Sequence, residues 1–178
     1  NGWFNCNQFH NPLNIKAHYN TTGPEIWNEY KTINGETSKP DALVLGTGTG
    51  GSLMGTGKFL KEYWDGIKIV AVEPAESPVM SGGDPGLHGI QGIGDGSKFM
   101  VNLDFLDGIR TISTPCAQAV SKHLALRYGL FVGISAGANV MAAFQWLRDN
   151  DKTNAITILC DRGERYLSCS WLNNLTRF

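Results

Sequence analysis

The chain passes from an aliphatic run into a glycine-rich turn and then into a helix-compatible segment at Leu43-Val44-Leu45-Gly46-Thr47-Gly48-Thr49-Gly50-Gly51-Ser52-Leu53-Met54-Gly55-Thr56-Gly57-Lys58. Glycine lets the backbone bend sharply and approach a ligand closely. A helix that follows directly presents unpaired N–H groups and a partial positive charge to that ligand. The stretch therefore predicts an anion-binding site, and a phosphate group is the anion that fits it.

Outward from this turn, aliphatic runs alternate with helix-compatible segments. Strands are predicted over residues 42–45, 67–73, 109–113 and 155–160, and helices over residues 22–30, 52–64, 114–128 and 137–148. Thr22 and Thr114 are the predicted N-caps of two of these helices. Strands separated by helices imply βαβ units, so we predict an α/β fold with a largely parallel sheet flanked by helices.

Three segments lack a clear hydrophobic period. Residues 5–20 are predicted to be a loop or an interdomain crossing, and the polar residues 32–41 an exposed connection. Residues 74–103 are long and glycine-rich, which indicates a functional loop or one that contains short helices. In parallel sheets ligands bind at the carboxyl ends of the strands, where the turn at residues 46–52 is also expected.

Length and composition restrict the function classes. The 178 residues suffice for one domain with a sizeable core, and 17% charged with 42% hydrophobic residues indicate a globular protein. A formal net charge of −1 without a block of like charges argues against nucleic-acid binding, and no apolar run is long enough to span a bilayer. The four cysteines and four histidines lack metal-ligand spacing, so no metal site is predicted.

We expect a cytoplasmic protein, and a chain that opens at Asn1 without Met leads us to expect a fragment or a processed chain.

The glycine-rich turn by itself allows more than one ligand. Gly46, Gly48 and Gly51 match the dinucleotide fingerprint GxGxxG, and Glu73 lies 22 residues after Gly51, where an acidic residue would bind the ribose of NAD. A nucleoside-triphosphate P-loop is excluded because Phe59 stands where the Mg²⁺-binding hydroxyl is required. The other possibility is one phosphate monoester held by residues 48–52, with backbone amides and two hydroxyls as donors.

Several further motifs follow one another in a particular order along the chain. They are Asn7-Gln8-Phe9-His10-Asn11-Pro12-Leu13-Asn14, Thr21-Thr22-Gly23-Pro24-Glu25-Ile26-Trp27, Gly48-Thr49-Gly50-Gly51-Ser52, Val72-Glu73-Pro74, His88-Gly89-Ile90-Gln91-Gly92-Ile93-Gly94, Gly133-Ile134-Ser135-Ala136-Gly137-Ala138 and Arg162-Gly163-Glu164-Arg165-Tyr166-Leu167-Ser168. In this order they resemble the cysteine synthase (O-acetylserine sulfhydrylase) and cystathionine β-synthase family, whose members bind pyridoxal 5′-phosphate in the tryptophan-synthase-β-like fold. The resemblance covers nearly the whole chain.

The resemblance implies a role for eight residues. The cofactor phosphate would be held by Gly48, Thr49, Gly50, Gly51 and Ser52. Ser135 would pair with the pyridine nitrogen, and a neutral hydroxyl there favours elimination and replacement at the β-carbon of the substrate. Gln8 would lie by the substrate carboxylate, and Gly92 belongs to the loop that would line the substrate entrance.

The family's Schiff-base lysine has no counterpart in this sequence, since no lysine stands in the matching context, so no catalytic residue is assigned here. We therefore interpret residues 1–14 as a crossing segment from a missing N-terminal domain and residues 15–178 as the larger, C-terminal cofactor-binding domain. The predicted function is β-replacement on serine or O-activated serine, foremost cysteine synthesis from O-acetylserine and sulfide, in a homodimer. Alternatives are cystathionine or lanthionine synthesis, cysteine desulfhydration or an NAD-binding domain. A further alternative is a non-catalytic module that keeps the phosphate cradle, which is the turn at residues 48–52.

Overall fold

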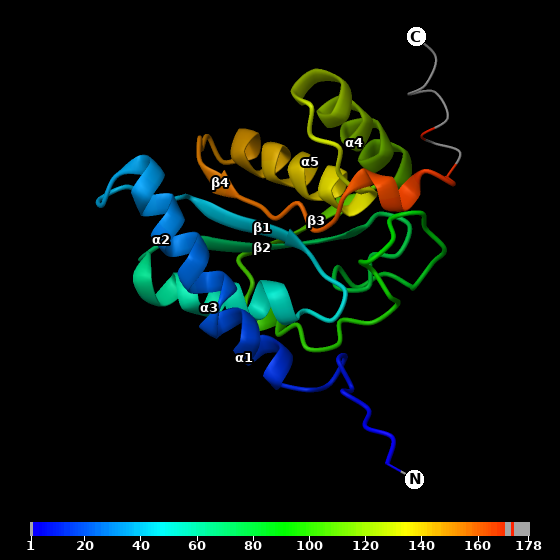
Figure 1. The fold of residues 1–178 in the computed structure, drawn as a ribbon, viewed down its shortest axis with the longest axis horizontal. Helices are drawn as coiled ribbons and strands as arrows, with labels where there is room; N and C mark the ends of the chain where they lie inside the picture. Colours follow the sequence, from blue (N-terminus) through cyan, green and yellow to red (C-terminus); the bar gives the residue numbers. More distant parts are fainter. Residues whose placement is uncertain (1, 170–171, 173–178) are drawn as a thin grey trace.

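Four parallel strands form the centre of the fold in the computed structural model, which describes residues 2–169 and 172 (Figure 1). The strands are β1 (Ala42–Gly46), β2 (Lys68–Pro74), β3 (Gly108–Ile112) and β4 (Ala155–Ile156). They lie in the order β3-β2-β1-β4, and each neighbouring pair is parallel. The predicted α/β fold with a largely parallel sheet is therefore confirmed.

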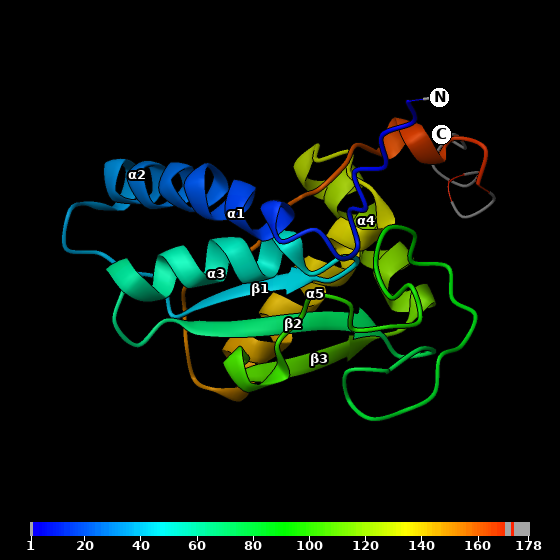
Figure 2. The same ribbon diagram turned by 90° about the horizontal axis from the view of Figure 1, so that it is seen from below.

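Five α-helices cover the two faces of this sheet in the described ranges. On one face lie α1 (Leu13–Asn20), α2 (Thr22–Asn34) and α3 (Gly51–Tyr63), and on the other lie α4 (Thr114–Tyr128) and α5 (Ile134–Asp149) (Figures 1 and 2). Two short 3₁₀ helices, η1 (Leu103–Phe105) and η2 (Gly163–Tyr166), complete the described elements. None of the helices in these ranges has both the length and the apolar character needed to cross a membrane.

Successive residues of β1 and β2 point to opposite faces of the sheet, so each face has its own core. On the α3 side Leu43, Leu45 and Ile69 pack with apolar side chains of the helix. On the α5 side Val44 and Val70 pack with the alanine-rich face of α5. Both strands are therefore buried on both faces, as is usual for a parallel sheet between two helical layers.

The prediction of a loop over residues 5–20 is wrong for its second half, where α1 forms. No residue of α1 is buried, and its apolar face consists of the partly buried Ile15 and Tyr19, so its sequence carries little helical signal. It forms because it packs closely on α3 at Gly55, where a Cβ atom would lie 2.3 Å from the carbonyl oxygen of Ile15. The boundary that we predict between residues 14 and 15 lies within α1 and stays a prediction.

Other helix ends differ from the prediction by a few residues. The helix predicted over residues 22–30 continues to Asn34, and its N-cap is Thr21 instead of Thr22. The N-cap of α4 is Ser113 instead of Thr114, with proline in the first turn. α5 begins at Ile134, three residues before the predicted start, which places Ser135 in its first turn.

The last predicted strand is much shorter than expected. Only Ala155 and Ile156 pair with β1, although the apolar run continues to Cys160. The long segment between β2 and β3 holds no regular element except η1, and it lies at the carboxyl end of the strands (Figure 1). These two irregular segments enclose the site described next.

Candidate active site

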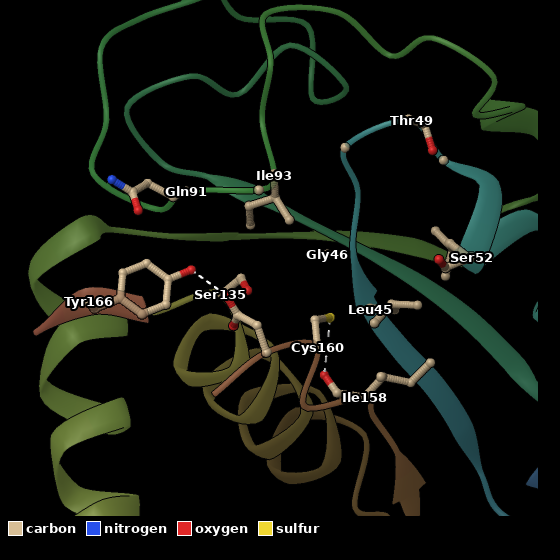
Figure 3. Close-up of a pocket in the computed structure, with 15 residues that line it drawn as sticks. Leu45, Gly46, Thr49, Ser52, Gln91, Ile93, Ser135, Ile158, Cys160 and Tyr166 are labelled. Atoms are coloured by element: carbon tan, nitrogen blue, oxygen red, sulfur yellow. Dashed lines mark hydrogen bonds between the residues drawn. The ribbon is translucent and has the colours of Figure 1, made fainter. Parts of the chain in front are cut away.

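A cavity of about 320 Å³ opens at the carboxyl end of β1. Four parts of the chain line it: the end of β1 with the start of α3, the loop at residues 91–93, the start of α5, and the segment from Ile158 to Tyr166 (Figure 3). The lining residues are Leu45, Gly46, Gly48, Thr49, Gly50, Ser52, Leu53, Gln91, Gly92, Ile93, Ser135, Ile158, Cys160, Asp161 and Tyr166. Its volume falls within the range of small-molecule sites, roughly 300–1,000 Å³.

Asn139 bridges two of the segments that line the cavity, the end of β1 and the chain beyond β4. Its Oδ1 accepts a hydrogen bond of 2.7 Å from the N–H of Gly46, and its Nδ2 donates one of 3.0 Å to the carbonyl of Ile158. The Thr157 hydroxyl likewise donates to the carbonyl of Val44 at 2.7 Å. Side chains therefore satisfy backbone groups that a longer β4 would have satisfied, and the gap beyond them is lined by Leu45 and Ile158.

The glycine-rich turn brings the backbone close to the cavity. A Cβ atom at Gly48 would lie 2.8 Å from the carbonyl oxygen of Gly92, so only glycine fits between the turn and the facing loop. Gly50 is the N-cap of α3 with φ of +85°, a conformation that glycine adopts without strain. The first N–H groups of α3 have no acceptor within the helix, so they provide a neutral donor set for an anion at this end of the cavity.

Two hydrogen-bond donors hold the hydroxyl of Thr49 in place. Its Oγ1 accepts hydrogen bonds from Nδ2 of Asn14 at 3.1 Å and from the N–H of Gly51 at 3.2 Å. The same nitrogen of Asn14 donates to the carbonyl of Gln8 at 3.0 Å. A Cβ atom at Gly51 would lie 2.0 Å from Oδ1 of Asn14, so this glycine leaves room for the amide.

The hydroxyl of Ser52 is the second one at this end of the cavity. It lies 3.0 Å from Nε2 of His18, whose Nδ1 is 2.9 Å from the Thr22 hydroxyl. Burial lowers the pKa of His18 below its ordinary value of 6.5. His18 is therefore a neutral imidazole at pH 7, with each ring nitrogen facing one hydroxyl.

Ser135 lies between the glycine-rich end of the cavity and Tyr166 (Figure 3). It is only 4% exposed, and among the described residues its hydroxyl has no hydrogen-bond partner. A nearly buried hydroxyl usually has a partner, so this one is suited to bind a ligand in the cavity. It is not the N-cap of α5, because that position belongs to Gly133.

Tyr166 and Asp161 close the opposite end. The phenol donates a 2.5 Å hydrogen bond to Oδ2 of Asp161, and burial, followed by this contact, raises the pKa of Tyr166. Oδ1 of Asp161 is buried without a partner in the described part of the chain. Gly133 makes room for both side chains, since a Cβ atom there would lie 2.0 Å from Oδ1 of Asp161 and 2.6 Å from the Tyr166 ring.

The structure brings most of the predicted site residues together. Six of the eight line the cavity: Gly48, Thr49, Gly50, Ser52, Gly92 and Ser135. Gly51 lies behind the lining, and Gln8 is exposed, with its backbone carbonyl bound to Asn14. The roles of all eight toward a cofactor or substrate stay predictions.

Sequence reasoning missed five residues that shape the site. They are Asn14, His18, Asn139, Cys160 and Asp161. Asn14 occurs in a motif that carries the resemblance, whereas nothing in the local pattern singles out His18. A buried amide in the middle of an alanine-rich helix is the one signal that could have indicated Asn139.

Glu73 is not arranged to bind a ribose. It is 2% exposed, and its carboxylate accepts hydrogen bonds from the N–H groups of Met80 at 2.7 Å and Ser81 at 3.0 Å, and from the Ser81 hydroxyl at 2.6 Å. Both oxygens thus hold the loop after β2. This occupation weighs against the dinucleotide interpretation of the glycine-rich turn, which requires a free carboxylate.

The donor set suits an anionic group attached to a partly apolar body. Backbone amides and two hydroxyls lie at one end, Leu45 and Ile93 in the wall, and the unpaired hydroxyl of Ser135 opposite them. No lysine or arginine is present among the lining residues of the described chain. The described residues also contain no group of three histidine, cysteine or acidic side chains that could hold a metal ion.

Comparison with known proteins connects this geometry to a family. The sequence profile of the family described as "Pyridoxal-phosphate dependent enzyme" matches residues 1–161. A cysteine synthase of Staphylococcus aureus is 42% identical over 171 residues, which is 94% of this chain and 53% of that protein.

Solved structures give the same result. A cysteine synthase of Entamoeba histolytica superposes with a TM-score of 0.86 at 38% identity, over 96% of this chain and 49% of that one. A hydrogen sulfide-producing enzyme of Fusobacterium nucleatum also reaches 0.86 at 38% identity, over 93% and 49%. The chain thus spans about half the length of the relatives it matches. With a profile match over most of its length and a site that fits the cofactor, the chain belongs to the family of pyridoxal-phosphate dependent enzymes.

Proposed function

We propose that the protein carries out pyridoxal-phosphate dependent β-replacement on an O-activated serine, foremost the synthesis of cysteine from O-acetylserine and sulfide. The observation that carries the proposal is the unpaired hydroxyl of Ser135, which shares one cavity with a phosphate-type donor set at the start of α3. When bound, the cofactor withdraws electrons from the substrate's α-carbon and allows the β-substituent to leave.

The residues of this chain would bind the cofactor and orient it. Thr49, Ser52 and the first N–H groups of α3 would hold the phosphate, with Gly48 and Gly50 allowing close approach. The hydroxyl of Ser135 would donate a hydrogen bond to the ring nitrogen and keep its proton. Because a hydroxyl does not protonate that nitrogen, the ring is a moderate electron acceptor, which suits elimination at the β-carbon.

The walls would limit access of water and substrate. Gln91 and Ile93 lie on one side of the cavity, and Ile158 and Cys160 on the other (Figure 3). We assign Gln8 and the loop at Gly92 to the substrate side, as the sequence indicates. The group that abstracts and returns the substrate proton, a lysine in the resembled family, is not among the lining residues.

A related second function differs only in the attacking group. The hydrogen sulfide-producing relative matches this chain with the same TM-score and the same identity as the cysteine synthase from Entamoeba. Release of sulfide from cysteine would need the same cofactor and the same β-carbon chemistry. We also propose, in line with the sequence, a homodimer in the cytoplasm and a cofactor-binding domain that begins near residue 15.

The proposal is tested with two assays on the purified protein. In the first, O-acetylserine and sulfide are supplied and the cysteine formed is measured. In the second, cysteine alone is supplied and the sulfide released is measured. We expect cysteine synthesis to exceed sulfide release, and the product to require added or retained pyridoxal phosphate. Sulfide release as the faster reaction would favour the second function. A protein that binds NAD and takes up no pyridoxal phosphate would contradict both.

A further inference from the structure

Asn14 joins three parts of the site through one amide group. Its Nδ2 lies 3.0 Å from the carbonyl oxygen of Gln8 and 3.1 Å from Oγ1 of Thr49, and its Oδ1 occupies the space beside Gly51. We propose that Asn14 is a positioning residue that aims the hydroxyl hydrogen of Thr49 into the cavity, and thereby makes the site select the phosphorylated form of its cofactor. The proposal rests on the proposed cofactor role of the cavity.

The orientation of the Asn14 amide is fixed by its neighbours. The carbonyl of Gln8 can only accept a hydrogen bond, so the nitrogen of the amide must face it. That nitrogen carries two hydrogens, and the structure provides two acceptors, Gln8 and Thr49. A flipped amide would set two oxygens against each other at 3.0 Å and lose the bond to the Gln8 carbonyl. Thr49 is therefore the acceptor in its contact with Asn14.

The hydroxyl of Thr49 then has one direction left for its hydrogen. A hydroxyl has two acceptor sites and one hydrogen. Asn14 uses one acceptor site, and the N–H of Gly51, at 3.2 Å, uses the other. Among the described residues the Thr49 hydroxyl donates to no acceptor, and Thr49 lines the cavity. Its hydrogen is thus available only to a ligand there.

A donor of fixed direction favours a ligand atom that can only accept. The oxygens of an ionised phosphate monoester are such atoms, whereas the hydroxymethyl group of unphosphorylated pyridoxal also carries a hydrogen. Gly51 belongs to the same arrangement, because a side chain there would displace the amide of Asn14. The amide of Asn14 thus explains why residue 51 is a glycine.

The experiment compares binding of pyridoxal phosphate and of pyridoxal to the complete protein, by titration of cofactor fluorescence. In Asn14→Asp the carboxylate cannot donate, and the Thr49 hydroxyl would turn its hydrogen toward it. We expect affinity for pyridoxal phosphate to fall about tenfold or more, with less than about a threefold change for pyridoxal. Asn11→Asp is the matched control, since it adds the same charge three residues earlier and keeps the oxygen that accepts from Leu13.

Two further variants separate positioning from mere support of the fold. Asn14→Ala adds no charge and no bulk beside Gly51, and it should lower only the affinity for pyridoxal phosphate, by about threefold. In a Thr49→Val background the same change should cost nothing, because the hydroxyl that Asn14 positions is gone. Equal losses for both cofactors, or a cost that persists in the Thr49→Val background, would overturn the inference.

The same binding measurements distinguish a failure of the proposed function from a failure of the role proposed for Asn14. If the wild-type protein binds neither pyridoxal phosphate nor pyridoxal, the cofactor role of the cavity is wrong and the inference falls with it. If the wild type binds pyridoxal phosphate and the variants keep its preference over pyridoxal, only the role of Asn14 is wrong.

Discussion

The side-chain oxygen of Asn139 accepts a 2.7 Å hydrogen bond from the backbone N–H of Gly46, although the two residues lie in different layers of the fold. Asn139 is 0% exposed, and its nitrogen binds the carbonyl of Ile158. The amide thus takes the place of a strand pairing and keeps the cavity open at the end of β1.

Asn139→Ala should destabilise the protein markedly. The change leaves the N–H of Gly46 and the carbonyl of Ile158 without side-chain partners in partly buried positions at the cavity wall. Each such group costs about 1–3 kcal/mol, so we expect a loss of about 2–4 kcal/mol in the free energy of unfolding. Urea denaturation followed by circular dichroism measures it. Asn150→Ala, which removes only a bond to the carbonyl of Trp146, should cost less than about 1 kcal/mol. Equal effects would contradict this role.

Gly50→Ala should damage both stability and cofactor binding. Its φ is +85°, and a Cβ atom would lie 2.7 Å from Cγ2 of Val101. Gly82→Ala is the matched control, because its φ is +87° with nothing within 4 Å of a Cβ atom. The control should cost about 1 kcal/mol from backbone strain alone, and Gly50→Ala at least about 1 kcal/mol more. Differential scanning calorimetry checks this, and equal shifts of the melting temperature would argue against the contact with Val101.

Ser135→Ala should change the spectrum of the bound cofactor and slow turnover. The hydroxyl is nearly buried and has no partner within the described chain, so its loss disturbs the protein itself little. A hydrogen bond to the cofactor contributes about 1 kcal/mol, which corresponds to about a fivefold lower rate. Ser168→Ala, at an exposed position, serves as the control. A Ser135→Ala protein with the wild-type spectrum and rate would show that the hydroxyl does not contact the ring.

Stability of the cofactor-free protein should fall in mild acid because of His18. Burial lowers the pKa of its imidazole in the folded chain below the ordinary 6.5. Below pH 6.5 the unfolded chain therefore binds more protons than the folded one, so the stabilising contribution is complete above that pH and is lost as the pH falls through the lowered pKa. Chemical denaturation between about pH 7 and about pH 5 should show a smaller decrease for His18→Gln than for wild type. Parallel curves for the two proteins would exclude His18 as the source.

The elements with strong local signals were predictable from the sequence. The continuous apolar runs of β1 and β2, the glycine-rich turn between β1 and α3, and the proline at the start of α4 each depend on local chemistry, and the structure confirms the elements they predict. The cradle at residues 48–52 was predictable for the same reason. Of its glycines, Gly50 is required by its own backbone conformation, whereas Gly48 and Gly51 make room for Gly92 and Asn14.

The remaining elements depend on contacts between distant residues. α1 has a short apolar face and packs on α3 where Gly55 admits the carbonyl of Ile15. β4 ends after Ile156 because side chains of Thr157 and Asn139 replace the ladder beyond it. The partners of Thr49 and Ser52 come from α1, which a loop prediction over that segment could not provide.

The most direct test of the account is the visible absorption spectrum of the protein purified without added cofactor, before and after dialysis against a carbonyl-trapping amine. We expect an absorption band from bound pyridoxal phosphate that the amine removes and that added pyridoxal phosphate, but not pyridoxal, restores in full. A complete protein that shows no such band and takes up no pyridoxal phosphate would contradict it.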